Sequence, residues 1–395
     1  MVAIGFLAQG AAYGMTYGMA GTFIGPATQE FGASRVAASL GPSLVALLHG
    51  LLGPIVGWWL ARRSVRPVLW AGALMMAAAF AVMYIARDIW TFSLAYGLLG
   101  GVAVSCLGMT PVTALVTRWF PERHGRALGF AFMPILVMLL PPVAGYINVH
   151  QGWRTTALLA ALAALAMLPL FALVREPRGT PAHNLPSDAA FAMTAGQTDS
   201  GTDRFRPDAA FWLLVAAVGI FDGSAITMIT HVIPYATEIG IDYQRATLLV
   251  SIMGLCGLAG APLLGMLADR IGGAATLAMV AVLLAIGWAP YLFDPPLAVL
   301  AGAMALLGFC GGAFAGLAGT ALARRFRGAA LGPAVGTAVF VALPFNFALP
   351  LLAGYLHDVT GTYRATFAYQ IAMFAFAFLM LWAVVRVEAG RRHPG

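Results

Sequence analysis

The chain has 395 residues, of which 61% are hydrophobic and 9% are charged, and its formal net charge is +7. Soluble domains carry about 25% charged residues, so this composition excludes an ordinary water-soluble globular protein. All 22 basic residues are arginines, and they lie in small groups between long apolar runs. This placement is typical of the topology signals of a membrane protein and not of a nucleic-acid-binding surface.

The apolar runs predict twelve transmembrane α-helices, because about 20 apolar residues cross a bilayer core about 30 Å thick. Continuous runs of this kind are not the alternating pattern of a membrane β-barrel. The predicted spans are residues 2–24, 35–60, 67–86, 89–117, 126–147, 153–174, 209–233, 244–268, 274–292, 295–321, 328–352 and 364–386. The three cysteines, Cys106, Cys256 and Cys310, all lie inside these runs and are interpreted as small core residues.

The arginines also predict the orientation of the spans. Seventeen of the 22 fall in loops or tails on one side of the predicted membrane, and five fall on the other. Arginine-rich connections stay in the cytoplasm, so both termini are predicted to be cytoplasmic, in a bacterial inner membrane. Residues 176–208 lie on the same side and are rich in Pro, Gly, Ser, Thr and Asp. We interpret them as a flexible tether between an N-terminal bundle, 1–175, and a C-terminal bundle, 209–395; binding of a partner by this segment is the alternative.

The two predicted bundles carry related landmarks. Residues 54–62, PIVGWWLAR, and residues 262–270, PLLGMLADR, align at an offset of 208 residues. A segment at residues 152–156 has an echo at residues 361–366. Parallel repeats of this kind are typical of secondary transporters, in which two six-helix units are related by an axis along the membrane normal.

With these motifs the chain resembles the major facilitator superfamily over nearly its whole length. The segment GMLADRIG at residues 265–272 looks like the signature loop of that family. The resemblance implies a conformational latch at helix ends. Its residues are Gly265, Asp269 and Arg270, with Gly57, Arg62 and Arg66 in the first-half copy. That copy has Ala61 where the acid is expected, so its latch is expected to be weaker.

Within the superfamily, three stretches look most like bacterial relatives of the monocarboxylate porters. They are residues 30–35, EFGASR, residues 118–125, RWFPERHG, and residues 231–240, HVIPYATEIG. Such porters often carry a buried arginine in the eighth span and a lysine in the first, and neither is present in this sequence: Arg245 lies at the end of the span at residues 244–268, and residues 2–24 contain no lysine. The glycine-proline signature of antiporters is also absent from the fifth span, at residues 126–147.

Two ionisable side chains inside the apolar runs are candidates for proton coupling. Asp222 is the only carboxylate deep in a predicted span, where a charged acid is costly unless it faces water or a partner. A structural acid bonded to a neighbouring helix is the alternative. His49 is the second candidate, although a neutral histidine that only joins two helices is an equally open interpretation.

Polar side chains on the same spans are candidates for a solute cavity. Gln9, Tyr13, Thr16 and Tyr17 form a stripe on the first helix. Ser224, Thr227 and His231 lie opposite Asp222 on an ideal helix, so either Asp222 or these three face a cavity, unless Gly223 marks an unwound turn. Weaker candidates are Thr110, Thr113 and Asn346.

These patterns predict a secondary active transporter that moves a small organic solute by alternating access, with proton-coupled uptake of a small monocarboxylate as the preferred function. The alternatives are a carrier of a neutral or cationic solute that uses Asp222 as its counter-charge, and a non-transporting membrane sensor. No cluster of metal ligands, phosphate-binding glycine loop or catalytic set is found, so no cofactor, no metal site and no enzymatic activity are expected. The expected partners are the solute, protons and the lipid bilayer; no nucleic acid is expected and no oligomer is required.

Overall fold

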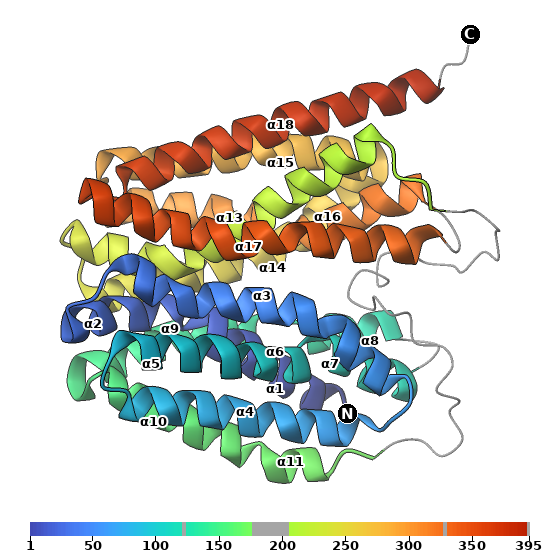
Figure 1. The fold of residues 1–395 in the computed structure, drawn as a ribbon. Coiled ribbons are helices and arrows are strands. Elements are labelled where there is room, and N and C mark those ends of the chain that lie inside the picture. Colours follow the sequence, from blue (N-terminus) through green and yellow to red (C-terminus); the bar gives the residue numbers. More distant parts are fainter. Residues whose placement is uncertain (121–123, 176–204, 327–329, 393–395) are drawn as a thin grey trace.

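The computed structural model describes residues 1–120, 124–175, 205–326 and 330–392, and all regular structure in these ranges is helical. Figure 1 shows an N-terminal bundle, in blue to green, beside a C-terminal bundle, in yellow to red. The N-terminal helices are α1 (Val2–Tyr13), α2 (Ala20–Phe31), α3 (Arg35–Leu60), α4 (Val65–Ile85), α5 (Ile89–Leu94), α6 (Gly100–Leu107), α7 (Met109–Trp119), α8 (His124–Ala131), α9 (Ile135–Gln151), α10 (Trp153–Ala166) and α11 (Leu168–Ala172). The C-terminal helices are α13 (Ala209–Glu238), α14 (Tyr243–Ile271), α15 (Gly273–Trp288), α16 (Leu297–Arg325), α17 (Leu331–Thr360) and α18 (Arg364–Arg392). Residues 176–204 of the predicted tether lie outside the described residues.

Eleven helical segments in the described residues are long and apolar enough to cross a membrane. The twelfth rod is the first one in the chain, where α1 and α2 are joined by a π-helical turn, Gly14–Gly18. This turn packs against α9, and a methyl group at Gly14 would lie 3.0 Å from the backbone of Leu136. The prediction of twelve helices in two six-helix bundles is therefore confirmed. The first rod ends at Phe31 and not near residue 24, because Pro26 is accommodated inside α2.

The fourth and fifth spans are also interrupted, and the sixth is divided into α10 and α11 at Met167. The fourth contains a π-helical turn at Ala95–Leu99 and a break at Gly108, between α6 and α7. The fifth is divided into α8 and α9 just before Pro134, which precedes the first residue of α9. Such breaks leave backbone groups without their helical partners, and in membranes they are tolerated where protein or a water-filled space surrounds them.

The internal repeat is visible in the packing of the two bundles. Each bundle has its own buried apolar core, one drawn from residues 8–174 and the other from residues 210–384. In the first, the Arg118 side chain at the end of α7 donates to the carbonyl of Leu60, at the end of α3, over 2.5 Å. In the second, Arg324 at the end of α16 donates to the carbonyl of Asp269, near the end of α14, over 2.9 Å. Two equivalent helix ends are thus capped by equivalent arginines.

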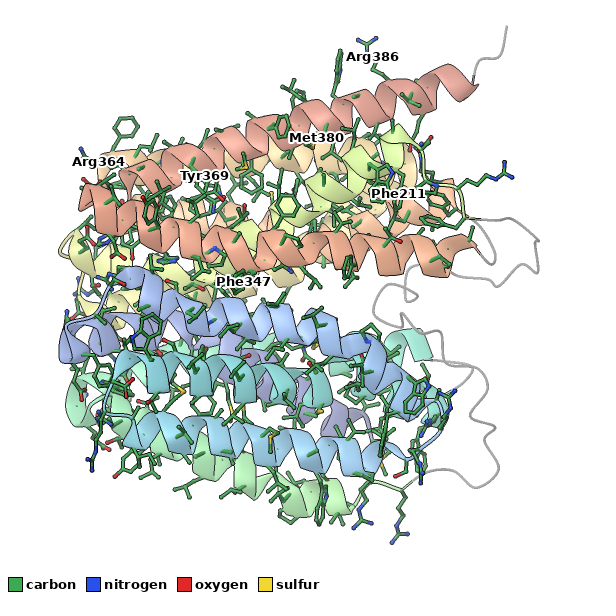
Figure 2. All side chains as sticks on the ribbon, viewed as in Figure 1. Phe211, Phe347, Arg364, Tyr369, Met380 and Arg386 are labelled. Carbon is green, nitrogen blue, oxygen red and sulfur yellow. The ribbon has the colours of Figure 1, made fainter. Side chains whose placement is uncertain are left out.

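The bundles meet along three helix pairs: α3 with α17, α9 with α14 and α2 with α13. We call the end of the molecule that contains Phe31–Arg35, Glu238–Tyr243 and Thr360 the sealed end, because side chains of the two bundles bond to each other there. The chain termini lie toward the opposite end (Figure 1). Arg364 is the first residue of α18, Arg386 lies toward the other end of that helix, and Phe347 on α17 lies at the boundary between the bundles (Figure 2).

The outer surface of both bundles is apolar, as a membrane-facing surface requires. Leu255, Phe340 and Leu379 are each more than half exposed. Several arginines stack on exposed tryptophans near helix ends, as Arg62 does on Trp58, at 4.4 Å from the ring centroid. Tryptophan and arginine at such positions are typical of the membrane–water interface.

Candidate functional site

Asp222 lies halfway along α13, on the side that faces α17. Its Oδ2 accepts a hydrogen bond of 3.0 Å from the side-chain amide of Asn346 on α17. The Asp222 side chain is only partly buried, although it is far from both ends of its span. The carboxylate therefore has one fixed neutral partner and a remaining side that borders a space between helices.

The backbone of α13 excludes one of the possibilities that the sequence leaves open, an unwound turn at Gly223. α13 runs without interruption through Gly223, so no unwound turn brings both faces together. A methyl group at Gly223 would lie 2.5 Å from the carbonyl oxygen of Phe345. The glycine thus allows α13 and α17 to approach closely, which brings Asp222 within hydrogen-bonding distance of Asn346.

A second polar group faces Asp222 from the N-terminal bundle. The Tyr13 hydroxyl is hydrogen-bonded to His49 Nε2 at 3.0 Å, and the Tyr13 ring stacks on Tyr17. Both tyrosines lie close enough to Asp222 to interact with it electrostatically across the boundary between the bundles. Gly108 lies beside this pair, since a methyl group there would lie 3.3 Å from the Tyr13 ring and 3.5 Å from the His49 ring. The break between α6 and α7 thus lies directly beside the Tyr13–His49 pair.

Four polar atoms among the candidate residues are buried without a hydrogen-bond partner in the described part of the chain. They are Gln9 Oε1, His49 Nδ1, Thr113 Oγ1 and Asn346 Oδ1. An unsatisfied buried polar atom costs about 1–3 kcal/mol, so such atoms are unusual in packed protein. Thr110 is partly buried at the start of α7. A solute with donor and acceptor groups would find complementary atoms here.

Four other residues that the sequence predicts to line the cavity have side chains hydrogen-bonded to groups away from Asp222. Thr16 donates to the carbonyl of Ala12, and Thr227 to that of Gly223, both within their own helices. Ser224 donates to Gln370 on α18, over 2.7 Å. His231 Nε2 donates to the carbonyl of Pro350, over 3.0 Å, and lies 3.3 Å from Ser39 Oγ. Because α13 does not unwind, the face that carries Ser224, Thr227 and His231 is turned away from Asp222.

The predicted latch residues lie at the end opposite the sealed end. Arg62 and Arg66 stack on Trp58 and Trp70 of their own bundle. No ion pair involves the side chain of Asp269 or Arg270 within the described ranges. Space is open around Gly265, where a methyl group would meet no atom within 4 Å. Gly57 lies in the last turn of α3, whose end Arg118 caps. These residues are thus not joined to the opposite bundle in this conformation.

Sequence reasoning missed the residues that join the bundles at the sealed end. Asn148 on α9 donates to the carbonyl of Thr22 and to the hydroxyl of Tyr243 on α14, both over 2.9 Å. The carboxylate of Asp358 on α17 bonds to the first turn of α3. Asn148 lies one residue beyond the predicted end of its span, and Asp358 six residues beyond, so the sequence places both in loops. The sequence feature that could have identified both residues is a polar side chain shortly after the end of an apolar run.

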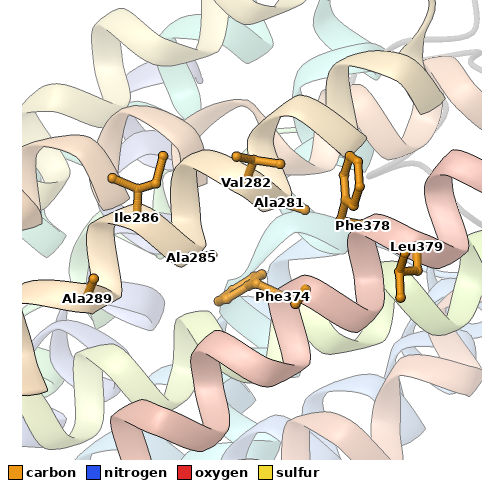
Figure 3. Close-up of a pocket in the computed structure, with 9 residues that line it drawn as sticks. Ala281, Val282, Ala285, Ile286, Ala289, Phe374, Phe378 and Leu379 are labelled. Atoms are coloured by element: carbon orange, nitrogen blue, oxygen red, sulfur yellow. The ribbon is translucent and has the colours of Figure 1, made fainter.

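A separate hollow of about 480 Å³ lies between α15 and α18 on the outside of the C-terminal bundle (Figure 3). Its lining is apolar, with Phe374, Phe378 and Ile286 as the largest side chains. Ile286 and Leu379 are more than half exposed at the outer surface. The hollow carries no polar group able to orient a solute and is distinct from the Asp222 site.

Comparison with known families gives a consistent result. The family model described as Major Facilitator Superfamily matches residues 6–234 and 213–395. The structure superimposes on the xylose transporter XylE from E. coli, solved in a partially occluded inward open conformation, with a TM-score of 0.69, 16% identity and coverage of 97% of this chain and 98% of that one.

Relatives with similar sequences include proteins from bacteria and vertebrates. An uncharacterized MFS-type transporter, YcxA of Bacillus subtilis, is 30% identical over 38% of this chain, and the match spans only 37% of that relative's length. Monocarboxylate transporter 12-B of Danio rerio is 25% identical over 88% of this chain and 78% of its own length. Monocarboxylate transporter 13 of Bos taurus is 25% identical over 76% and 69%, respectively.

Proposed function

The chain belongs to the major facilitator superfamily, a family of membrane transporters and not of enzymes, and we propose that it carries a small monocarboxylate together with a proton by alternating access. The observation that carries this proposal is the position of Asp222. It is a partly buried acid at the boundary of the two bundles, with Asn346 as its fixed partner and Tyr13 and Tyr17 opposite. The similarity to monocarboxylate transporters supports the substrate class.

Repulsion between the negative solute and the Asp222 carboxylate explains why a proton must bind together with the solute. Two negative charges 4 Å apart repel each other by about 4 kcal/mol at an effective dielectric constant of about 20. A carboxylate solute beside an ionised Asp222 would therefore bind about a thousandfold more weakly than beside a protonated one. The sequence contains no lysine, and its arginines lie near the ends of spans, so no basic side chain at this depth offsets the repulsion. Binding of the anion and protonation of Asp222 are thus coupled.

Neutral donors would hold the anion once Asp222 is protonated. The neutral donors on this part of the chain are the Tyr13 hydroxyl, the His49 ring through Nδ1, and the amide NH2 group of Asn346, while Gln9 lies one helical turn before Tyr13. A buried carboxylate needs several such hydrogen bonds to replace its water. The solute and the proton together then form a neutral pair, which crosses the boundary between the bundles as they rock.

The distribution of arginines supports one orientation of the protein in the proposed cycle. With both termini cytoplasmic in a bacterial inner membrane, as the arginine distribution favours, the sealed end faces outward and the structure represents an inward-facing state. Bundles 1–175 and 209–395 would move as units, with residues 176–208 as a tether. Asp269, Arg270 and their first-half counterparts Arg62 and Arg66 would engage the opposite bundle when the cytoplasmic end closes.

Replacement of Asp222 by asparagine tests the coupling. Asp222→Asn removes the titratable group and keeps the shape of the side chain. In proteoliposomes, uptake of radiolabelled pyruvate driven by an inward proton gradient should collapse, while exchange of pyruvate across the membrane without a gradient continues. Full gradient-driven accumulation by the variant would exclude Asp222 as the proton carrier and leave His49 as the remaining candidate.

A second candidate function rests on the same absence of a basic residue beside Asp222. A cationic or neutral solute could use the ionised carboxylate directly as its counter-charge, with Tyr13 and Tyr17 as a cation–π surface. Binding across pH separates the two functions. Pyruvate affinity that rises as the pH falls supports proton-linked carboxylate transport. Binding of tetraethylammonium that is lost as the pH falls, and in Asp222→Asn, supports the alternative.

A further inference from the structure

Three aspartates at the sealed end cap the amino ends of helices. Two of them cap the helix that follows them in the chain, and the third caps a helix of the opposite bundle. Asp88 accepts hydrogen bonds from the backbone N–H and the hydroxyl of Thr91, in the helix that follows it, over 2.8 and 2.7 Å. Asp242 accepts from the N–H of Arg245 in the same manner, over 3.1 Å. Both acids thus cap their own helices, α5 and α14. Asp358 lies near the end of α17 and caps a helix of the opposite bundle.

The helix that Asp358 caps is α3, more than 300 residues earlier in the chain. Asp358 Oδ1 accepts from the N–H of Arg35 over 2.9 Å, and Oδ2 accepts from the N–H of Val36 over 3.0 Å. The first amides of a helix have no partner inside the helix. Ser34, the residue before α3, accepts only from the N–H of Ala37, over 3.2 Å. The first turn of α3 is therefore fully bonded only while α17 lies against it.

Packing shows that this contact depends on a close approach of the two backbones. Gly354 lies one turn before Asp358 and is buried. A methyl group at Gly354 would lie 3.0 Å from the carbonyl carbon of Arg35 and 3.0 Å from the backbone nitrogen of Val36. A side chain there would crowd the start of α3 and force the two backbones apart by at least a few tenths of an ångström. Gly354 and Asp358 thus form one surface that fits the amino end of α3.

The charged neighbours of Asp358 do not take over its role. The Arg35 guanidinium donates to the hydroxyl of Thr28, over 3.3 Å, and forms no ion pair with Asp358 in the described residues. His357 is bonded to Glu238 at 2.8 Å, and its other ring nitrogen is 3.8 Å from Asp358. The hydrogen bonds of the carboxylate therefore go to the α3 amides. Bonds from N–H groups to a carboxylate are stronger than neutral ones, and the positive end of the helix dipole favours the charge further.

We propose that Asp358 is a gate residue of the transport cycle: its carboxylate holds the sealed end shut by capping α3 of the opposite bundle. In a carrier that works by alternating access, α3 and α17 must separate at this end so that solute can enter from that side. The two hydrogen bonds then break, and the first turn of α3 loses its cap. The inference rests on the alternating access proposed above, but not on the identity of the solute or the coupling ion.

The test compares Asp358→Ala with Asp88→Ala in the full-length protein. Asp88 is the matched control, because it is also an aspartate cap at the sealed end but remains within one bundle. Spin labels are attached at Gln29→Cys and Val359→Cys, both exposed positions on opposite bundles, after the three native cysteines are replaced by alanine. Double electron–electron resonance spectroscopy then measures the distribution of distances between the two spin labels, which gives the ratio of sealed to open molecules.

Loss of hydrogen bonds to a charged group is expected to shift this ratio toward the open form by about tenfold or more in Asp358→Ala. The Asp88→Ala variant should keep the distance distribution of the parent. An unchanged distribution in Asp358→Ala, or an equal shift in both variants, would overturn the proposal.

A second pair of variants tests the same surface by steric means and does not depend on removal of the carboxylate. Gly354→Ala should open the sealed end, whereas Gly25→Ala on α2, where no atom lies within 4 Å of the new methyl, should not. A sealed Gly354→Ala protein would contradict the proposal even if Asp358→Ala failed to fold. The gate and the coupling residue can fail separately. If Asp358→Ala shifts the distance while Asp222→Asn retains normal proton coupling, the gate is supported and the role of Asp222 is refuted.

Discussion

The packing of α14 against α16 predicts opposite effects for the same substitution at two adjacent glycines. A methyl group at Gly312 would lie 2.2 Å from the carbonyl oxygen of Gly257 and 2.6 Å from its Cα. At Gly311 no atom lies within 4 Å of the new methyl. Gly312→Ala must therefore push two backbones apart, because a carbonyl in a helix cannot rotate aside. Gly311→Ala adds its methyl to open space.

The magnitudes follow from these distances. Overpacking of a well-packed contact costs about 1–3 kcal/mol. Replacement of a helical glycine by alanine gains about 0.5–1 kcal/mol where space allows. The gain applies to both substitutions, so Gly311→Ala should be neutral or slightly stabilising, and the two variants should differ by the cost of overpacking alone, about 1–3 kcal/mol. In membranes, small residues such as glycine at helix contacts let the two backbones approach closely.

Thermal unfolding of the purified variants in detergent measures the difference. Tryptophan fluorescence or loss of the monodisperse peak in size-exclusion chromatography should show a lower midpoint for Gly312→Ala than for the parent, and an unchanged or higher midpoint for Gly311→Ala. Equal midpoints for the two variants would refute the close contact between α14 and α16.

Two further predictions concern single side chains, one at a helix end and one at the solute site. Arg325 is 6% exposed and bridges Asp208, at 2.5 Å, and Glu388, at 3.5 Å. The two acids are 36% and 29% exposed and stay partly solvated, so Arg325→Gln should destabilise the protein by about 1.5–3 kcal/mol through the lost charged hydrogen bonds. The check is a lower unfolding midpoint, and an unchanged midpoint would contradict the role of this bridge. Tyr13→Phe removes the bond to His49 and should lower pyruvate affinity severalfold without affecting the midpoint. Unchanged affinity would place Tyr13 outside the solute site.

The number, type and limits of the helices could be predicted because the apolar runs are long and local signals mark their ends. The span at residues 35–60 was predicted with the observed limits, since Ser34 is a good amino-terminal cap and arginines follow the apolar run. The least accurate ends are that of α17, which lies at Thr360 and not at residue 352, and that of the first rod, which lies at Phe31 and not at residue 24. The first rod continues through Pro26, which lies inside α2.

The polar site could be predicted only in part, because a helical wheel does not show what a hydroxyl bonds to. Thr16 and Thr227 have hydroxyls that return to carbonyls four residues earlier, and this choice is invisible in the pattern of residues. The partner of Asp222 was among the candidates, but its pairing with Asn346 depends on the close approach at Gly223. Asp358 depends on contact between segments more than 300 residues apart, which one sequence does not specify.

The central claim is that the solute and a proton cross the membrane together through Asp222. The most direct measurement is proton entry into proteoliposomes that contain the protein and an internal pH-sensitive dye, after pyruvate is added outside with no initial pH gradient. The account predicts that the lumen acidifies in step with pyruvate uptake, and that Asp222→Asn abolishes the acidification. Uptake of pyruvate without acidification, or acidification that persists in Asp222→Asn, would contradict it.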